Sequence, residues 1–141
     1  MARREDVLAY LTKVPLFSAC SKKDLALVSK HSEHLKIPAG TEMTTQGRVG
    51  YEFYIIIDGT ATVLRNGRKV NTIGAGASFG ELSLLDRAPR NATIKAETDI
   101  DALILGQREF SALLDLVPTL AHKLLIGLAR RTHEMDAKQV N

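Results

Sequence analysis

The sequence predicts a small antiparallel β-barrel or jelly roll, mainly β, with helices at both ends of the chain. Eight of the ten glycines lie between Gly40 and Gly80, which indicates short strands joined by tight turns. Both flanks are poor in glycine and carry apolar residues at helical spacing. The length of 141 residues suits one domain. We therefore expect a single domain over residues 1–141, with N-terminal helices in 1–33, strands in 34–106 and C-terminal helices in 107–141.

The N-terminal flank predicts two short helices separated by Pro15. Val7 and Leu11 are four residues apart and share one face of the first helix. Ser21 followed by Asp24 is typical of a helix start. A hydroxyl there accepts from free backbone N–H groups, and an acidic side chain suits the positive end of the helix dipole. We therefore expect the second helix to begin beside Ser21.

The glycine-rich middle of the chain predicts six to eight short antiparallel strands. Asn66-Gly67 is the strongest hairpin signal, because both positions tolerate positive φ. The segment 53–57 is β-branched and aromatic, which favours a strand. Strands are expected at residues 53–57, 60–64, 68–73, 92–96 and 102–105. So many short strands in about 70 residues are typical of a small barrel or jelly roll.

The C-terminal flank predicts two further helices, the second starting at Pro118, which suits a first helical turn. This second helix carries an apolar stripe that must pack on the barrel, on a partner helix or on both. The stripe consists of Leu120, Leu124, Leu125, Leu128 and Met135. The basic pair Arg130 and Arg131 is expected to be solvated or paired with a carboxylate, and a use of Arg131 in binding stays open.

Composition and charge exclude several classes of protein. The net charge of +3 is too weak to indicate a nucleic-acid partner by itself. The single cysteine, Cys20, excludes an intramolecular disulfide framework and fits a reducing compartment. No stretch approaches the roughly 20 apolar residues that span a bilayer, and the charged N-terminus is unlike a signal peptide. We expect a soluble, cytoplasmic protein with no membrane partner.

The sequence indicates no metal site and no enzyme chemistry. His31 and His34 are three residues apart on an expected helix, but no third ligand lies near them. All four histidines fall outside the expected strands, so a metal site of the cupin type is disfavoured. Neither a Gly-x-Ser-x-Gly elbow nor a phosphate-binding Walker loop is present. We therefore expect no metal, no cofactor and no catalytic activity.

The segment 79–94 carries the functional signal. Residues 80–84 can form one helical turn whose free N–H groups favour an anion. Arg90 lies just before an expected strand, and its guanidinium matches phosphate oxygens. Glu81 beside a phosphate needs a donor, and a sugar hydroxyl is one, so a sugar phosphate is the indicated ligand. Residues 65–95 hold six basic and two acidic side chains, a local excess of +4. The alternative is a surface loop in which Arg90 and Glu81 are solvated or paired with each other.

The run Phe79-Gly80-Glu81-Leu82-Ser83-Leu84-Leu85, followed by Pro89-Arg90-Asn91-Ala92-Thr93-Ile94, resembles the phosphate-binding cassette of cyclic nucleotide-binding domains. This family includes the catabolite activator protein and the regulatory subunits of protein kinase A. Residues 14–17, 37–40, 50–56 and 128–131 resemble other motifs of the family, so the resemblance covers nearly the whole chain. It implies a stand-alone domain with an eight-stranded antiparallel β roll, N-terminal helices and C-terminal B and C helices.

The resemblance also implies residue roles. Glu81 would accept the ribose 2′-hydroxyl and Arg90 would neutralise the cyclic phosphate. Backbone N–H groups around Ser83 and Ala92 would complete the phosphate cradle. The remaining ligand-binding residues would be Gly80, Leu82 and Asn91 in the cassette, Val63 and Val70 as pocket walls, and Met135 as a cap over the base. Asn91 replaces the usual Ala, Ser or Thr, which leaves cAMP against cGMP open, and Tyr51 stands where Asp or Glu is common.

The function that follows is non-catalytic sensing of cAMP or cGMP. Binding would shift the C-terminal helix between two positions and signal to an unknown protein effector, or through a homodimer built on the leucine stripe. One alternative is an interaction or dimerisation domain with an unused pocket, and another is a regulatory piece of a longer enzyme or channel. DNA binding is disfavoured, because no recognition helix follows the last helix in this sequence.

Overall fold

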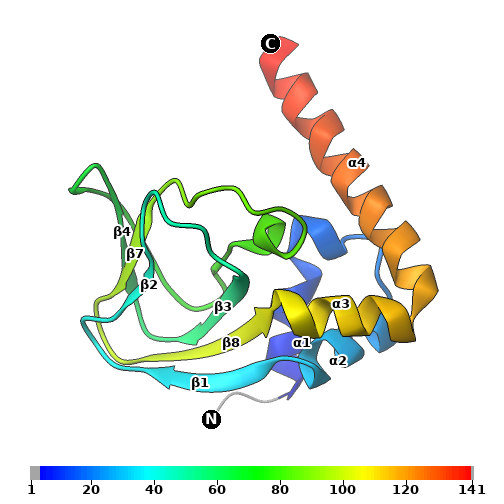
Figure 1. The fold of residues 1–141 in the computed structure, drawn as a ribbon, viewed down its shortest axis with the longest axis horizontal. Helices are drawn as coiled ribbons and strands as arrows, with labels where there is room; N and C mark the ends of the chain where they lie inside the picture. The colour runs from blue at the N-terminus through cyan, green and yellow to red at the C-terminus, as the bar shows by residue number, and fades with distance from the viewer. Residues whose placement is uncertain (1–3, 141) are drawn as a thin grey trace.

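The computed structural model describes residues 4–140, and their side chains from Val7 to Glu134. Within this range the chain forms three helical segments, eight strands and two C-terminal helices, with one short 3-10 turn between strands (Figure 1). The N-terminal segments are α1 (Arg4–Thr12), η1 (Pro15–Phe17) and α2 (Lys22–Lys30), and the turn is η2 (Glu81–Leu84). The C-terminal helices are α3 (Gln107–Leu116) and α4 (Pro118–Val140). The helix–strand–helix order predicted from glycine distribution is confirmed.

The strands form two four-stranded antiparallel sheets. The first sheet has the order β1-β8-β3-β6 and the second the order β2-β7-β4-β5. The bounds are β1 (Glu33–Ile37), β2 (Glu42–Thr44), β3 (Glu52–Asp58), β4 (Ala61–Arg65), β5 (Arg68–Ile73), β6 (Ser78–Phe79), β7 (Thr93–Ala96) and β8 (Ile100–Gly106). The eight-stranded antiparallel β roll is therefore confirmed.

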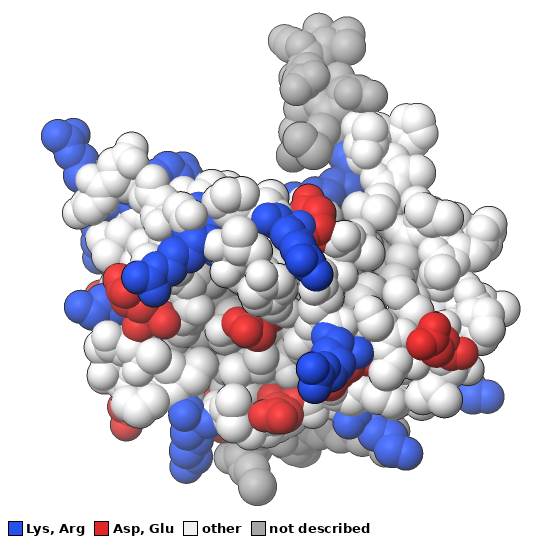
Figure 2. Space-filling view, in the orientation of Figure 1, with Lys and Arg blue, Asp and Glu red and all other residues white. Residues whose placement is uncertain are grey.

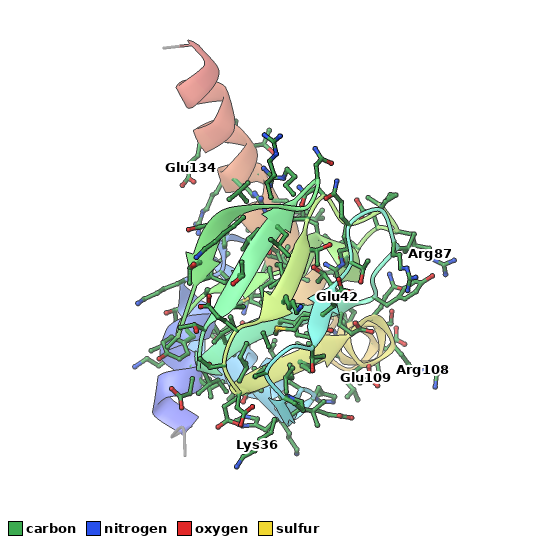
Figure 3. All side chains as sticks on the ribbon, turned by 90° about the vertical axis from the view of Figure 1, so that its left-hand side faces the viewer. Lys36, Glu42, Arg87, Arg108, Glu109 and Glu134 are labelled. Carbon is green, nitrogen blue, oxygen red and sulfur yellow. The ribbon has the colours of Figure 1, made fainter. Side chains whose placement is uncertain are left out.

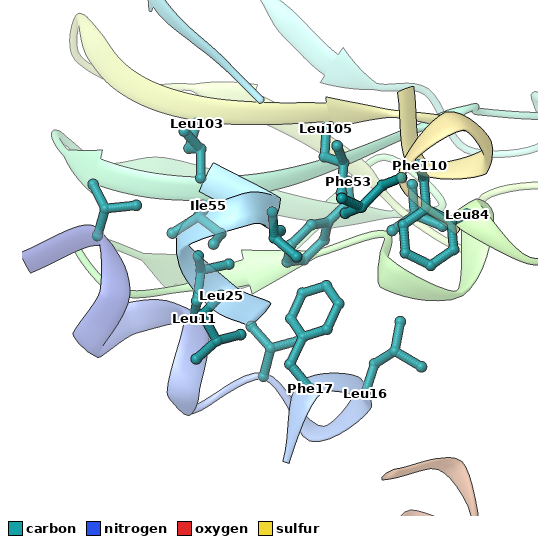
Figure 4. Close-up of a cluster of buried hydrophobic side chains, with 14 of the residues drawn as sticks. Leu11, Leu16, Phe17, Leu25, Phe53, Ile55, Leu84, Leu103, Leu105 and Phe110 are labelled. Atoms are coloured by element: carbon teal, nitrogen blue, oxygen red, sulfur yellow. The ribbon is translucent and has the colours of Figure 1, made fainter. Parts of the chain in front are cut away.

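Strand β3 of the first sheet is buried on both faces, which explains why it is apolar throughout its middle. Ile56 faces the second sheet, whereas Phe53 and Ile55 on alternate positions pack against the helices. Figure 4 shows the helix-facing side chains, with Leu11 and Phe17 closing on the sheet from the N-terminal segments. Burying one such side chain contributes about 1.5–3 kcal/mol. The helices are thus fixed to the sheet that carries η2 at its edge.

Local signals in the sequence are confirmed at two turns. Asn66 and Gly67 have φ values of 55° and 78°, so both adopt the left-handed conformation that a two-residue hairpin needs. Ser21 caps α2, because its Oγ accepts from the backbone N–H of Asp24 at 3.2 Å. The Asp24 carboxylate accepts in return from the N–H of Ser21 at 2.9 Å. This is a reciprocal capping box, with Asp24 as its acidic partner.

Helix α4 is fixed to α2 by an ion pair. The Lys123 Nζ donates to Asp24 Oδ2 at 2.6 Å, and the Asp24 side chain is 9% exposed. Burial opposes ionisation of Asp24, but the hydrogen bonds from Lys123 and Ser21 outweigh it and lower the pKa of Asp24 below its ordinary value. Asp24 is therefore charged at neutral pH and joins the N-terminal and C-terminal helices.

One expectation about the histidines is wrong. His34 lies in β1, paired with Leu103 of β8, and not on a helix with His31. The helix ends at Lys30 because His31 serves as its C-cap, and the strand begins two residues later. Within the described side chains, no group of three His, Cys, Asp or Glu residues could hold a metal ion.

No single described helix is long and apolar enough to cross a membrane. Helices α3 and α4 reach that length and apolarity only when they are counted together, across a bend of 118°.

Candidate functional site

The site begins where β6 ends and the chain turns at Gly80. Its φ of 85° is in the left-handed region, which favours glycine. A Cβ at this position would overlap the guanidinium of Arg90 and would lie 2.7 Å from the carbonyl oxygen of Glu52. Gly80 thus allows both the turn and the close approach of Arg90. The expected helical turn follows directly as η2.

The Arg90 guanidinium is held between backbone segments and has no carboxylate partner among the side chains from Val7 to Glu134. Its Nη2 donates to the carbonyl oxygen of Glu52 at 2.7 Å, and its Nε is buried without a hydrogen-bond partner. The backbone of Arg90 is fixed at 2.8 Å to both Arg48 and Gly47. Neither ion pair formed by the described residues includes Arg90. A partly buried positive charge without an anion is costly, so this position attracts a negatively charged group.

Glu81 is paired with the last helix and not with Arg90. Its Oε1 accepts from Arg131 Nη1 at 2.6 Å, and its side chain is 13% exposed. The second carboxylate oxygen, Oε2, accepts no hydrogen bond from the described residues. The expectation that Arg131 pairs with a carboxylate is confirmed. Its partner lies 50 residues away, so the sequence alone could not identify it.

The backbone donors of η2 differ from the expectation at Ser83. The Ser83 N–H already donates to the carbonyl oxygen of Gly80 at 3.0 Å. The N–H groups of Glu81 and Leu82 precede the first bond of the turn and make no backbone bond among the described residues. Both residues line the cavity described next, so their N–H groups belong to its wall.

These groups line a cavity of about 260 Å³ between the cassette and α4. It is lined by Gly80, Glu81, Leu82, Ser83, Asp86, Ala88, Pro89, Arg90, Asn91 and Arg131. The structure therefore brings most of the expected cassette residues together, and it adds Arg131 from α4. The sequence left a use of Arg131 in binding open, and its only signal was the Arg130-Arg131 pair near the end of the last helix.

Ala92, Val63 and Val70 do not line this cavity. Ala92 is buried, and its carbonyl oxygen accepts from Thr44 Oγ1 at 3.0 Å. Val63 packs against the core between the sheets, whereas Val70 on β5 is 52% exposed and sits at an irregularity of the β4–β5 ladder. The side chain of Met135 lies outside the described residues. The cavity thus brings together Arg90 and Glu81, the residues expected at the phosphate and at the sugar, but the two valines expected as an apolar wall do not line it.

Some of the charged side chains around the cavity form an ion pair and others do not. Arg131 and Glu81 neutralise each other, and Asp86 is exposed, with its Oδ1 accepting from the Ala88 N–H at 3.2 Å. Arg90 is the cation without an ion-pair partner among these described side chains, and it is part-buried whereas the unpaired Asp86 is exposed. Figure 2 shows Lys and Arg interspersed with Asp and Glu on this face, without a continuous basic surface. The site therefore suits one small anion rather than a polyanion.

Arg87 is close to the cassette in sequence but does not belong to the cavity. Its guanidinium lies 6.0 Å from the centre of the Tyr51 ring. Figure 3 shows Arg87 at the outer edge of the cassette loop, on the side away from α4. Arg87 is thus a cation of the same loop with a different environment from Arg90.

Other features of the described residues carry no comparable chemistry. A hollow of about 390 Å³ at the end of the first sheet includes Lys36, Asp58 and Asp99, which are exposed and solvated. Burial, together with the carboxylate of Asp24, raises the pKa of the Cys20 thiol to about 11, which keeps it protonated and unreactive at neutral pH.

Comparisons with known proteins agree on one family. A family model described as cyclic nucleotide-binding domain matches residues 34–116. A cAMP-dependent protein kinase regulatory subunit from Aspergillus niger is 37% identical over 114 residues, which cover 79% of this chain and 28% of that protein. A cyclic AMP receptor protein from Thermus thermophilus is 32% identical over 127 residues, covering 86% of this chain and 59% of that protein. The chain therefore spans less than two thirds of the length of these relatives.

A solved structure is similar to this chain in both fold and sequence. The regulatory domain of PKA from Toxoplasma gondii, in a co-crystal with cAMP, has a TM-score of 0.68 and 32% sequence identity to this chain. The match covers 80% of this chain and 46% of that chain.

Proposed function

This chain belongs to the cyclic nucleotide-binding domain family, and from that premise we propose that it binds a cyclic nucleotide in the cavity between η2, the segment up to Arg90, and α4. The unpaired Arg90 guanidinium carries the proposal, since its charge lacks the anion that a cyclic phosphate would supply. The printed names of the relatives make cAMP the first candidate. cGMP is the alternative, because Asn91 departs from the residues usual at this position.

The proposed roles follow from the donors and acceptors in the cavity. Arg90 and the free N–H groups of η2 hold the phosphate. Glu81 accepts the ribose 2′-hydroxyl through Oε2 while Arg131 keeps Oε1 in place. Asn91 and the N–H of Ala92 lie next to the phosphate, at the start of β7. The purine is proposed to extend out of this cavity toward Val63 of β4 and Val70 of β5, which would wall it. A cap over the base by Met135 stays a prediction, because that side chain lies outside the described residues.

We propose that the chain acts as a single non-catalytic sensor domain. The relatives named above are a regulatory subunit and a receptor protein, and the Cys20 thiol is protonated. A reducing, cytoplasmic location is proposed from the single-cysteine composition.

The signal is proposed to leave the site through α4. Arg131 contacts Glu81 directly, so a ligand that bonds to Glu81 changes the free energy of the helix position. Leu120 and Leu124 of the apolar stripe are buried within the domain, but Leu125 is 64% exposed. That exposed leucine supports a protein effector or a second copy of the chain as the receiver of the signal. It also supports the second candidate function, an interaction domain with an unused pocket.

The experiment is a calorimetric titration of Arg90→Ala and Arg87→Ala with cAMP. Loss of a charge-assisted phosphate contact should cost about 1.5–3 kcal/mol, so Arg90→Ala should weaken binding by tenfold or more. Arg87→Ala removes a cation of the same loop and should stay within about twofold of the wild type. Equal affinities of Arg90→Ala and the wild type would contradict the site, and the interaction domain would become the better account.

A further inference from the structure

Three of the positions at which helix α4 contacts the rest of the chain are four residues apart. Lys123, Gly127 and Arg131 occupy them, and residues at this spacing share one face of a helix. The first forms the ion pair with α2, and the last forms the ion pair with η2. Gly127, between the two ion pairs, contacts η1. This line of contacts joins the N-terminal segments to the candidate site.

Gly127 is a glycine for reasons of space and not of backbone conformation. Its φ is not positive, so any residue could adopt its helical backbone. It is buried, however, and a Cβ would overlap the carbonyl oxygen of Leu16. The same Cβ would lie 2.9 Å from the carbonyl oxygen of Pro15. Both obstacles are backbone atoms of η1, which cannot swing away as a side chain can, so α4 itself would have to move.

Such a movement would reach the candidate site. Gly127 and Arg131 are about 6 Å apart along the helix axis, a little more than one turn. Non-bonded carbon and oxygen atoms settle at about 3.3–3.6 Å, so the added methyl group requires a shift on the order of 1 Å. The contact between Arg131 Nη1 and Glu81 Oε1 is 2.6 Å. A shift of that size, transmitted along the helix, stretches the contact between Arg131 and Glu81 beyond hydrogen-bond length.

We infer that Gly127 is a positioning residue for the site. Because Gly127 has no side chain, α4 packs directly on the backbone of η1. The resulting short distance between α4 and η1 places Arg131 against Glu81. The inference rests on the proposed function where it treats Glu81 as a ligand contact. The geometric part concerns the unliganded protein and can be tested without nucleotide.

The test is a double-mutant cycle between Glu81 and Arg131 by urea unfolding, without nucleotide. Glu81→Gln, Arg131→Ala and their combination are compared in the wild-type and the Gly127→Ala backgrounds. We expect a coupling between the two residues with Gly127 present and none in the Gly127→Ala background. Ala129→Ser also adds one atom, but at an exposed position of α4, and should leave the coupling unchanged. Coupling that survives Gly127→Ala would overturn the inference.

A second background keeps the test informative if Gly127→Ala does not fold. Lys123→Ala removes the ion pair on the other side of Gly127 and leaves the η1 contact in place. The Glu81–Arg131 coupling should persist there, and its loss would show that the Lys123 pair, not Gly127, sets the helix position.

Binding of cAMP separates this inference from the proposed function. Arg131→Ala should weaken binding by about threefold to tenfold, because Glu81 loses the partner that orders it. Gly127→Ala should weaken it to the same extent, with no further loss in the double variant. Additive losses would overturn the positioning role. A wild type that does not bind cAMP, with the coupling pattern intact, would contradict the proposed function alone.

Discussion

Substitution of Glu81 by Gln tests the sugar contact, because it removes the charge and keeps the shape of the side chain. The Glu81 side chain is 13% exposed, and one of its oxygens is already bonded to Arg131. A hydrogen bond to a charged group is worth about 1.5–3 kcal/mol, and the partial exposure of the site favours the lower end. We therefore expect about tenfold weaker binding of cAMP to Glu81→Gln.

The assay is a calorimetric titration of both proteins with cAMP and with 2′-deoxy-cAMP. If Glu81 accepts the 2′-hydroxyl, the wild type should bind 2′-deoxy-cAMP about tenfold more weakly than cAMP. Glu81→Gln should bind the two ligands with nearly equal affinity, because the contact is already lost. Asp86→Asn is the matched control, since Asp86 lines the same cavity but is exposed and bonded to its own loop. If Glu81→Gln weakens the binding of cAMP and of 2′-deoxy-cAMP by the same factor relative to the wild type, the assignment of the 2′-hydroxyl to Glu81 is refuted.

Two further substitutions test the fold that supports the site. Asp24→Asn should lower the free energy of unfolding by about 2 kcal/mol at neutral pH, because it weakens the capping box and the Lys123 pair. The folded pKa of Asp24 is lowered, so its contribution is complete above the unfolded value of about 3.9 and is lost as pH falls through the folded pKa. Urea unfolding should therefore show the two proteins converging below about pH 4, and a constant difference would contradict this account. Gly80→Ala should cost more stability than Gly40→Ala, since both have positive φ but only Gly80 is crowded, by Arg90 and Glu52. Gly40→Ala should cost only the backbone strain of about 1–2 kcal/mol, and equal costs would show that the crowding is relieved.

Features set by neighbouring residues were predictable from the sequence. The Asn66-Gly67 hairpin and the Ser21–Asp24 capping box depend on contacts within three residues of each other. The cassette was predictable for the same reason, because η2 and Arg90 are only a few residues apart along the chain. Its resemblance to a known family added the ligand.

Features set by long-range pairing were not predictable. The placement of His34 in a strand depends on its register with β8, about 70 residues further on. The short strands β2 and β6 were not singled out, because two or three residues carry no periodic signal. The partner of Arg131 and the close contact at Gly127 likewise depend on where α4 crosses the domain. These contacts join the site to the helices.

The most direct test of the central claim is a calorimetric titration of the wild-type chain with cAMP, cGMP and AMP. The proposed site needs a cyclic phosphate beside Arg90 and a ribose hydroxyl beside Glu81. We predict saturable binding of one cyclic nucleotide per chain, at least tenfold tighter than binding of AMP. Absence of binding for both cyclic nucleotides at millimolar concentration, with a folded protein, would contradict the assignment of this cavity.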